Sequence, residues 1–132
     1  MKYMLMMHAR REGGDWQVAQ WPPAALRAHV DHMIRLNQDL SASGELVGAE
    51  GLTGPGEARV VRATDAGVPA VTDGPFAEAK EFLAGYWIVD CVSPERAYEI
   101  AARASAAPGP DGQPLGMAIE VRAVMSAPPP EM

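Results

Sequence analysis

The sequence is short of the residues on which several common kinds of site depend. Its single cysteine, Cys91, excludes an internal disulfide and both Cys-x-x-Cys redox and structural zinc sites. No two of its three histidines have the His-x-x-x-His spacing of a zinc site. The glycine-rich run 51–56 lacks the lysine and the following helix that hold a phosphate. We therefore expect no metal site, and the sequence gives no support for a flavin or nicotinamide cofactor.

Basic residues and long apolar runs are also scarce. The 132 residues include 11 Lys and Arg against 17 Asp and Glu, which gives a formal net charge of −6. An acidic domain without a basic cluster is a poor match for a phosphate backbone, so nucleic acid is not expected as a partner. No apolar run approaches the roughly 18 residues of a membrane span, and the apolar start 1–7 is too short for a signal peptide. These absences predict a cytoplasmic protein that binds neither nucleic acid nor membrane.

The patterning of the remaining residues predicts two helices and six strands. Apolar residues recur at three- and four-residue spacing from Ala24 to Ser43, which is typical of an amphipathic helix, and Gly44 follows as a helix-stopping residue. Ser93 and Pro94 start a second helix that runs to about Ala106. Strands are expected at residues 2–8, 45–52, 58–64, 68–72, 86–92 and 117–124.

This order predicts an α+β fold of ferredoxin-like type, a βαβ-βαβ sandwich with an added hairpin at residues 58–72. Residues 1–126 are expected to form one domain, and the proline-rich tail 127–132 is expected to be flexible. The strands 2–8 and 86–92 carry apolar side chains on both faces. Helices can cover only one face, so we expect a homodimer closed sheet to sheet over the other.

The segment from Thr72 to Gly85 contains the most distinctive local pattern. Its Asp73-Gly74-Pro75 corner is strong turn punctuation beside a buried strand. Together with Phe76, Glu78, Lys80, Glu81 and Gly85, this segment resembles the signature of the DGPF branch of the YCII-related family. Residues 1–5, 36–40, 44, 50–52 and 120–125 resemble other parts of that family. The resemblance implies a dimeric α/β barrel with a cavity between helices and sheet, and a His–Asp pair as the acid–base group.

Asp73 is the first candidate for catalysis, because a carboxylate at a corner beside a cavity can act as a general base or orient a histidine. The alternative is that it fixes the turn by accepting backbone N–H bonds. His29 and then His32, on the first helix, are the candidate partners. The alternative for each is a core histidine whose hydrogen bonds are satisfied structurally.

Glu78, Lys80 and Trp87 are the candidate ligand contacts. Glu78 and Lys80 can instead form the solvated face of a turn, with Lys80 paired to an acid across the dimer. Two functions stay open: a small-molecule-binding homodimer with acid–base activity of isomerase or lyase type, and a non-catalytic ligand-binding or regulatory module. The identity of the small-molecule ligand does not follow from the sequence.

Overall fold

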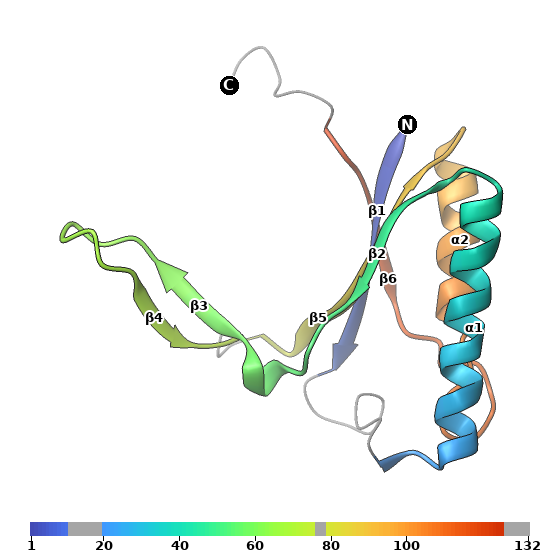
Figure 1. Cartoon of the computed structure of the whole chain (residues 1–132), viewed down its shortest axis with the longest axis horizontal. Coiled ribbons are helices and arrows are strands. Elements are labelled where there is room, and N and C mark those ends of the chain that lie inside the picture. Colours follow the sequence, from blue (N-terminus) through green and yellow to red (C-terminus); the bar gives the residue numbers. More distant parts are fainter. Residues whose placement is uncertain (11–19, 76–78, 126–132) are drawn as a thin grey trace.

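The computed structural model describes residues 1–10, 20–75 and 79–125. A four-stranded antiparallel sheet carries both helices on one face (Figure 1). Its strand order is β2 (Leu46–Gly51), β5 (Glu81–Asp90), β1 (Lys2–Arg10) and β6 (Ile119–Ala123). The helices are α1 (Pro23–Ala42) and α2 (Pro94–Ser105). This arrangement confirms the predicted α+β, ferredoxin-like class.

The local signals for the two helices act as the sequence predicts. Gly44 follows α1 with a φ of 80°, the left-handed conformation that glycine adopts without steric cost. At the start of α2 the side chain of Ser93 accepts a hydrogen bond from the backbone N–H of Arg96 at 3.2 Å, and Pro94 occupies the first turn. Both helix bounds therefore lie within a residue or two of those predicted.

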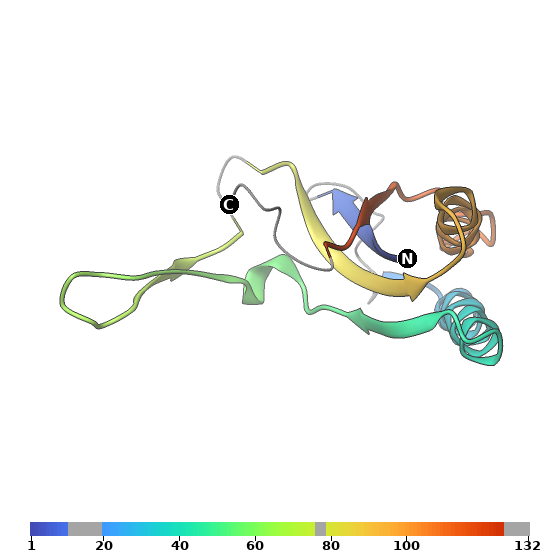
Figure 2. The ribbon, with the colours of Figure 1, turned by 90° about the horizontal axis from the view of Figure 1, so that it is seen from above.

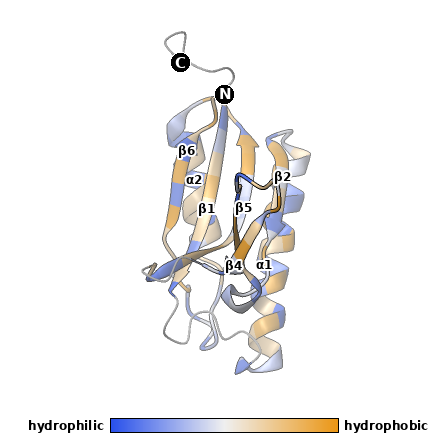
Figure 3. Cartoon of the chain, turned by 90° about the vertical axis from the view of Figure 1, so that its left-hand side faces the viewer, coloured by the Kyte–Doolittle hydropathy of each residue, from blue (hydrophilic) through white to orange (hydrophobic). Residues whose placement is uncertain are grey.

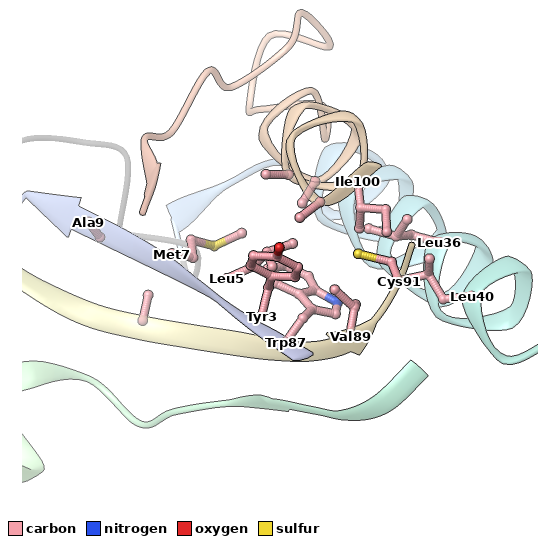
Figure 4. Packing of buried hydrophobic residues seen from close by; sticks show 14 of the residues in the cluster. Tyr3, Leu5, Met7, Ala9, Leu36, Leu40, Trp87, Val89, Cys91 and Ile100 are labelled. Carbon is pink, nitrogen blue, oxygen red and sulfur yellow. The ribbon is translucent and has the colours of Figure 1, made fainter. Parts of the chain in front are cut away.

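Strand alternation separates a helix-facing side of the sheet from an open side. Along β1, the residues Tyr3, Leu5, Met7 and Ala9 are buried, while the intervening Met4, Met6 and His8 are only half-buried. The buried set packs with residues of α1, α2 and β5 into one core (Figure 4). Members of that core contributed by the helices, by β5 and by the residue that follows β5 are Leu36, Leu40, Phe82, Ala84, Trp87, Val89, Cys91, Ala97, Ile100, Ala101 and Ala104.

The other side of the sheet is the open face, toward which Figure 3 looks. No helix covers it in the described part of the chain (Figure 1). By strand alternation it carries Met4 and Met6 of β1, Tyr86 and Ile88 of β5, and Glu120 of β6. The open face is therefore apolar at its centre, with charged residues on both edge strands: Glu50 on β2, and Glu120 and Arg122 on β6.

The predicted hairpin forms a separate two-stranded sheet, β3 (Arg59–Arg62) with β4 (Ala70–Asp73). It follows the short 3-10 helix η3 (Pro55–Glu57). We call residues 58–74 the arm. A hydrogen bond from Gly74 N–H to the Ala58 carbonyl, at 2.9 Å, closes its base. The arm projects away from the side of the sheet that carries the helices (Figures 1 and 2).

Three details of the fold depart from the sequence expectation or lie beyond it. β5 begins at Glu81 rather than Tyr86, because Phe82 and Ala84 are buried and extend the pairing with β1 across a bulge. Val30 and Ile34 of α1 are exposed, so the buried stripe of that helix is narrower than its apolar arc. The predicted tail 127–132 lies outside the described residues.

Within the described ranges, no helix combines the length and apolar character needed to cross a membrane.

Candidate functional site

A cavity of about 210 Å³ lies between α1 and the edge of the sheet formed by β2 and β5. Trp87 and Asn37 stand on opposite walls, one from the sheet and one from the helix. Most of the remaining lining is apolar. The lining residues are Met7, Met33, Asn37, Ala49, Glu50, Gly51, Ala84, Gly85, Tyr86 and Trp87. A largely apolar lining with few polar groups is the composition of small-molecule sites, and a volume below their usual range of roughly 300–1,000 Å³ suits only a compact ligand.

The two walls are joined by a hydrogen bond. The indole Nε1 of Trp87 donates to Oδ1 of Asn37 at 2.8 Å. Trp87 is only 6% exposed, so this bond provides the partner that a buried indole N–H requires. The bond also fixes the rotation of the amide: its oxygen accepts from the indole, and its Nδ2 hydrogens are left to donate elsewhere.

The sheet side of the cavity depends on a pair of glycines that face each other across β2 and β5. Gly51 and Gly85 are register partners. A Cβ added to Gly85 would lie 2.9 Å from the backbone oxygen of Glu50, closer than real side chains approach. A Cβ added to Gly51 would meet nothing within 4 Å. Gly85 is therefore required for the close approach of β2, and Gly51 is not.

A strong ion pair secures the segment that leads into β2. Glu45 accepts hydrogen bonds from Nη2 and Nε of Arg96 at 2.8 and 2.9 Å, which joins this segment to α2. These bonds from the Arg96 guanidinium lower the pKa of Glu45 to about 2, and a further bond from Ser43 acts in the same direction. The role of this pair is to hold α2 against the start of the cavity-lining strand.

The structure does not bring Asp73 together with His29 or His32. Asp73 is the last residue of β4, in the arm, and its side chain is 97% exposed. Nε of Arg59, in the same arm, lies 3.8 Å from its Oδ1. The arm and α1 extend from opposite sides of the main sheet (Figure 1).

The two histidines of α1 are both engaged with backbone carbonyls near α2. His29 donates from Nδ1 to the carbonyl of Pro108 at 3.0 Å, and His32 donates from Nε2 to the carbonyl of Arg103 at 2.8 Å. The ring of His29 also meets Trp21 edge to face, with 5.3 Å between ring centroids. These contacts tie the two helices together.

The predicted ligand contacts fall in three different places. Trp87 lines the cavity. Lys80 is exposed immediately before β5, and Glu78 lies outside the described residues. Asn37 was not predicted as a site residue, although its position four residues after Met33 places both on one face of α1. That spacing is the signal that could have found it.

A second contact that was not predicted joins β1 to β6 on the open face. Nε2 of His8 lies 2.9 Å from Oε1 of Glu120, and the side chain of His8 is 28% exposed. The carboxylate can only accept when ionised, so His8 donates from Nε2 in this pair. Within the described ranges, no three His, Cys, Asp or Glu side chains converge as metal ligands would.

The family model of the YCII-related domain matches residues 1–109. The chain belongs to the YCII-related family. An uncharacterized protein of Rhizobium meliloti (strain 1021) is 40% identical over 74 residues, which cover 51% of this chain and 59% of that relative. The match spans about three-fifths of the length of that relative, whose name states no activity.

Proposed function

We propose that the protein is a cytoplasmic homodimer of the DGPF branch that binds a small neutral organic molecule in the cavity between α1, β2 and β5. In this proposal Nδ2 of Asn37 donates a hydrogen bond to a carbonyl oxygen of the ligand. The observation that carries the proposal is the bond from Trp87 to Asn37 on the cavity wall, because it presets the amide for an acceptor. A preset donor costs less to order on binding than a freely rotating one.

The size and lining of the cavity narrow the class of ligand. Its volume of about 210 Å³ corresponds to about seven water molecules at roughly 30 Å³ each. The apolar body of the ligand would contact Met7, Met33 and Ala49. Glu50 pairs with Tyr86, so alternation places its side chain on the open face, and the other lining residues carry no charge, which favours a neutral ligand. A compact amide, ester or ketone satisfies these conditions.

Binding is favoured over acid–base catalysis by the positions of the predicted catalytic residues. Asp73 lies in the arm, while His29 and His32 each bond to a backbone carbonyl beside α2. Proton transfer requires the acid and the base to reach one substrate within hydrogen-bond distance. Acid–base catalysis by Asp73 with either histidine therefore stays a prediction, and ligand binding is the function that the geometry supports better.

The open face supports the homodimer. Met4, Met6 and Ile88 lie at its centre on adjacent strands, where β1 pairs with β5. Contiguous apolar surface of this kind is uncommon on a soluble monomer. Pairing two copies about a two-fold axis would cover it, and a stable interface of this type buries more than about 1,000 Å² in total.

A thermal-shift screen with small neutral amides, esters and ketones tests the proposed binding. Compounds that raise the melting temperature of the wild type should lose this effect in Ala49→Leu, which fills the cavity. Val92→Leu is the matched control, because Val92 is exposed in the turn before α2. Shifts of equal size in Ala49→Leu and in the control would contradict the cavity as the binding site.

A further inference from the structure

The arm is an extended element that forms a sheet of its own. Each of its strands pairs with the other, and within the described ranges neither pairs with a strand of the main sheet. A two-stranded hairpin by itself is at best marginally stable in water, and its two outer edges leave backbone groups unpaired. An arm held in one conformation therefore needs a surface to lie against.

One face of the arm presents an apolar pair. Val61 and Val71 are direct register partners, and their exposed fractions are 60% and 58%. Alternation places Arg59 and Asp73 on the same face, where they approach each other at 3.8 Å. Charge on this face is therefore balanced within the arm, which leaves the valine pair as the group with most to gain from burial.

At its base the arm forms an elbow with the main sheet, and this elbow contains a second hollow of about 360 Å³. Pro75, from the Asp-Gly-Pro corner, lines it together with Phe82 and Leu83 of β5. The other lining residues are Leu52, Thr53, Gly54, Pro55 and Ala58. Except for the Thr53 hydroxyl, these side chains are apolar or absent, so the hollow suits apolar protein side chains.

The direction of the arm identifies its partner. The arm projects toward the side of the open face, away from both helices (Figures 1 and 2). In the proposed dimer the second copy occupies that side. An arm with this direction must then run alongside the partner rather than through solvent, and two-fold symmetry gives each copy the same contact.

We propose that the arm of each subunit packs against the second copy of the chain. This contact buries the Val61–Val71 pair against the partner and closes the elbow hollow. This inference rests on the proposed dimer and adds the element that completes its interface. It also assigns a role to the Asp73-Gly74-Pro75 corner: the corner sets the point at which the arm returns to the sheet.

The test combines two measurements on the full chain. In sedimentation equilibrium, the dissociation constant of the dimer should be at least about 10-fold higher for the double variant Val61→Asp/Val71→Asp than for the wild type. The control variant Val92→Asp should have the wild-type dissociation constant. In the wild type, exchange of the arm amides 59–62 and 70–73 with solvent should slow by at least about 10-fold when protein concentration is raised through the dimerisation range.

The outcomes separate this inference from the dimer on which it rests. One outcome is a wild-type dimer whose dissociation constant is unchanged in the double variant and whose arm amides exchange equally fast at all concentrations. That result overturns the proposed contact of the arm but leaves the dimer. A wild type that stays monomeric at all concentrations overturns both. Amide exchange is measured without substitution, so the result does not depend on how the variants fold.

Discussion

The indole of Trp87 on β5 and the amide of Asn37 on α1 are joined by a 2.8 Å hydrogen bond across the wall of the cavity. The two residues are 50 positions apart in the sequence. One bond therefore attaches the first helix to a central strand and orients the Asn37 amide, which we propose as the hydrogen-bond donor to the ligand. The stability of the fold and the proposed recognition of a ligand therefore depend on the same pair of residues.

Asn37→Ala should destabilise the protein, because it leaves the buried indole N–H of Trp87 without this partner. We expect the free energy of unfolding to fall by roughly 1–3 kcal/mol. Urea unfolding monitored by circular dichroism provides the measurement. Gln38→Ala is the control, since Gln38 is the exposed neighbour on the same helix. Equal stability of the two variants would mean that the bond contributes nothing.

Gly85→Ala should be much less stable than Gly51→Ala, although the two glycines are register partners. The added Cβ at Gly85 meets the backbone oxygen of Glu50 at 2.9 Å, whereas the one at Gly51 meets nothing within 4 Å. We expect a loss of roughly 1–3 kcal/mol at Gly85 from this overpacking. Gly51→Ala should be neutral or slightly stabilising. Thermal unfolding of both variants decides the matter, and similar melting temperatures would refute the steric argument.

Glu45→Gln should lower stability at neutral pH and lose its effect in acid. The bonds from Arg96 lower the pKa of Glu45 in the folded state from 4.5 to about 2. The folded state thus binds fewer protons than the unfolded state, so this stabilisation is present above about pH 4.5 and is lost as the pH falls toward 2. We expect a difference of roughly 1–3 kcal/mol at pH 7.

The control for Glu45 is Glu99→Gln. Glu99 also bonds to Arg96, at 3.1 Å, but its side chain is 68% exposed. An exposed pair of this kind contributes between about 0 and 1 kcal/mol. Urea unfolding of the wild type and both variants from pH 7 to pH 3 gives the comparison. A Glu45→Gln penalty that stays constant over this range would contradict the assigned cause.

Light scattering of the wild type should give a mass of about 28 kDa, twice the 14.0 kDa of one chain. Met6→Asp or Ile88→Asp places a charge on the open face and should give insoluble protein instead of a stable monomer. Lys2→Ala, which replaces an exposed residue at the start of β1, should leave the mass unchanged. A wild-type mass near one chain, independent of concentration, would rule out the dimer.

The features that the sequence predicted are those encoded by local patterns. Helix α1 ends before Gly44 because that glycine adopts a left-handed conformation, and Ser93 with Pro94 starts α2. The hairpin of the arm followed in the same way from its turn residues, with Gly67 at a φ of 79°. Each signal depends on a few neighbouring residues, so none of them required knowledge of the tertiary structure.

The features that could not be predicted depend on contacts between distant residues. Asn37 looks like any polar residue of an amphipathic helix until the packing of α1 places it beside Trp87. The early start of β5 depends on the burial of Phe82 against the core. For Asp73, the corner was identified but its surroundings were not, because the direction of the arm is set by the path of the backbone after β2.

The most direct test of ligand binding is a ¹H–¹⁵N titration of the labelled protein with small neutral amides, esters and ketones. We predict that compounds that bind will shift the indole N–H of Trp87 and the side-chain amide of Asn37 together, and that Ala49→Leu will abolish both shifts. Trp87→Phe assigns the indole signal among those of the three tryptophans. Compounds that shift only signals remote from this cavity, or that bind Ala49→Leu as tightly as the wild type, would contradict the proposed site.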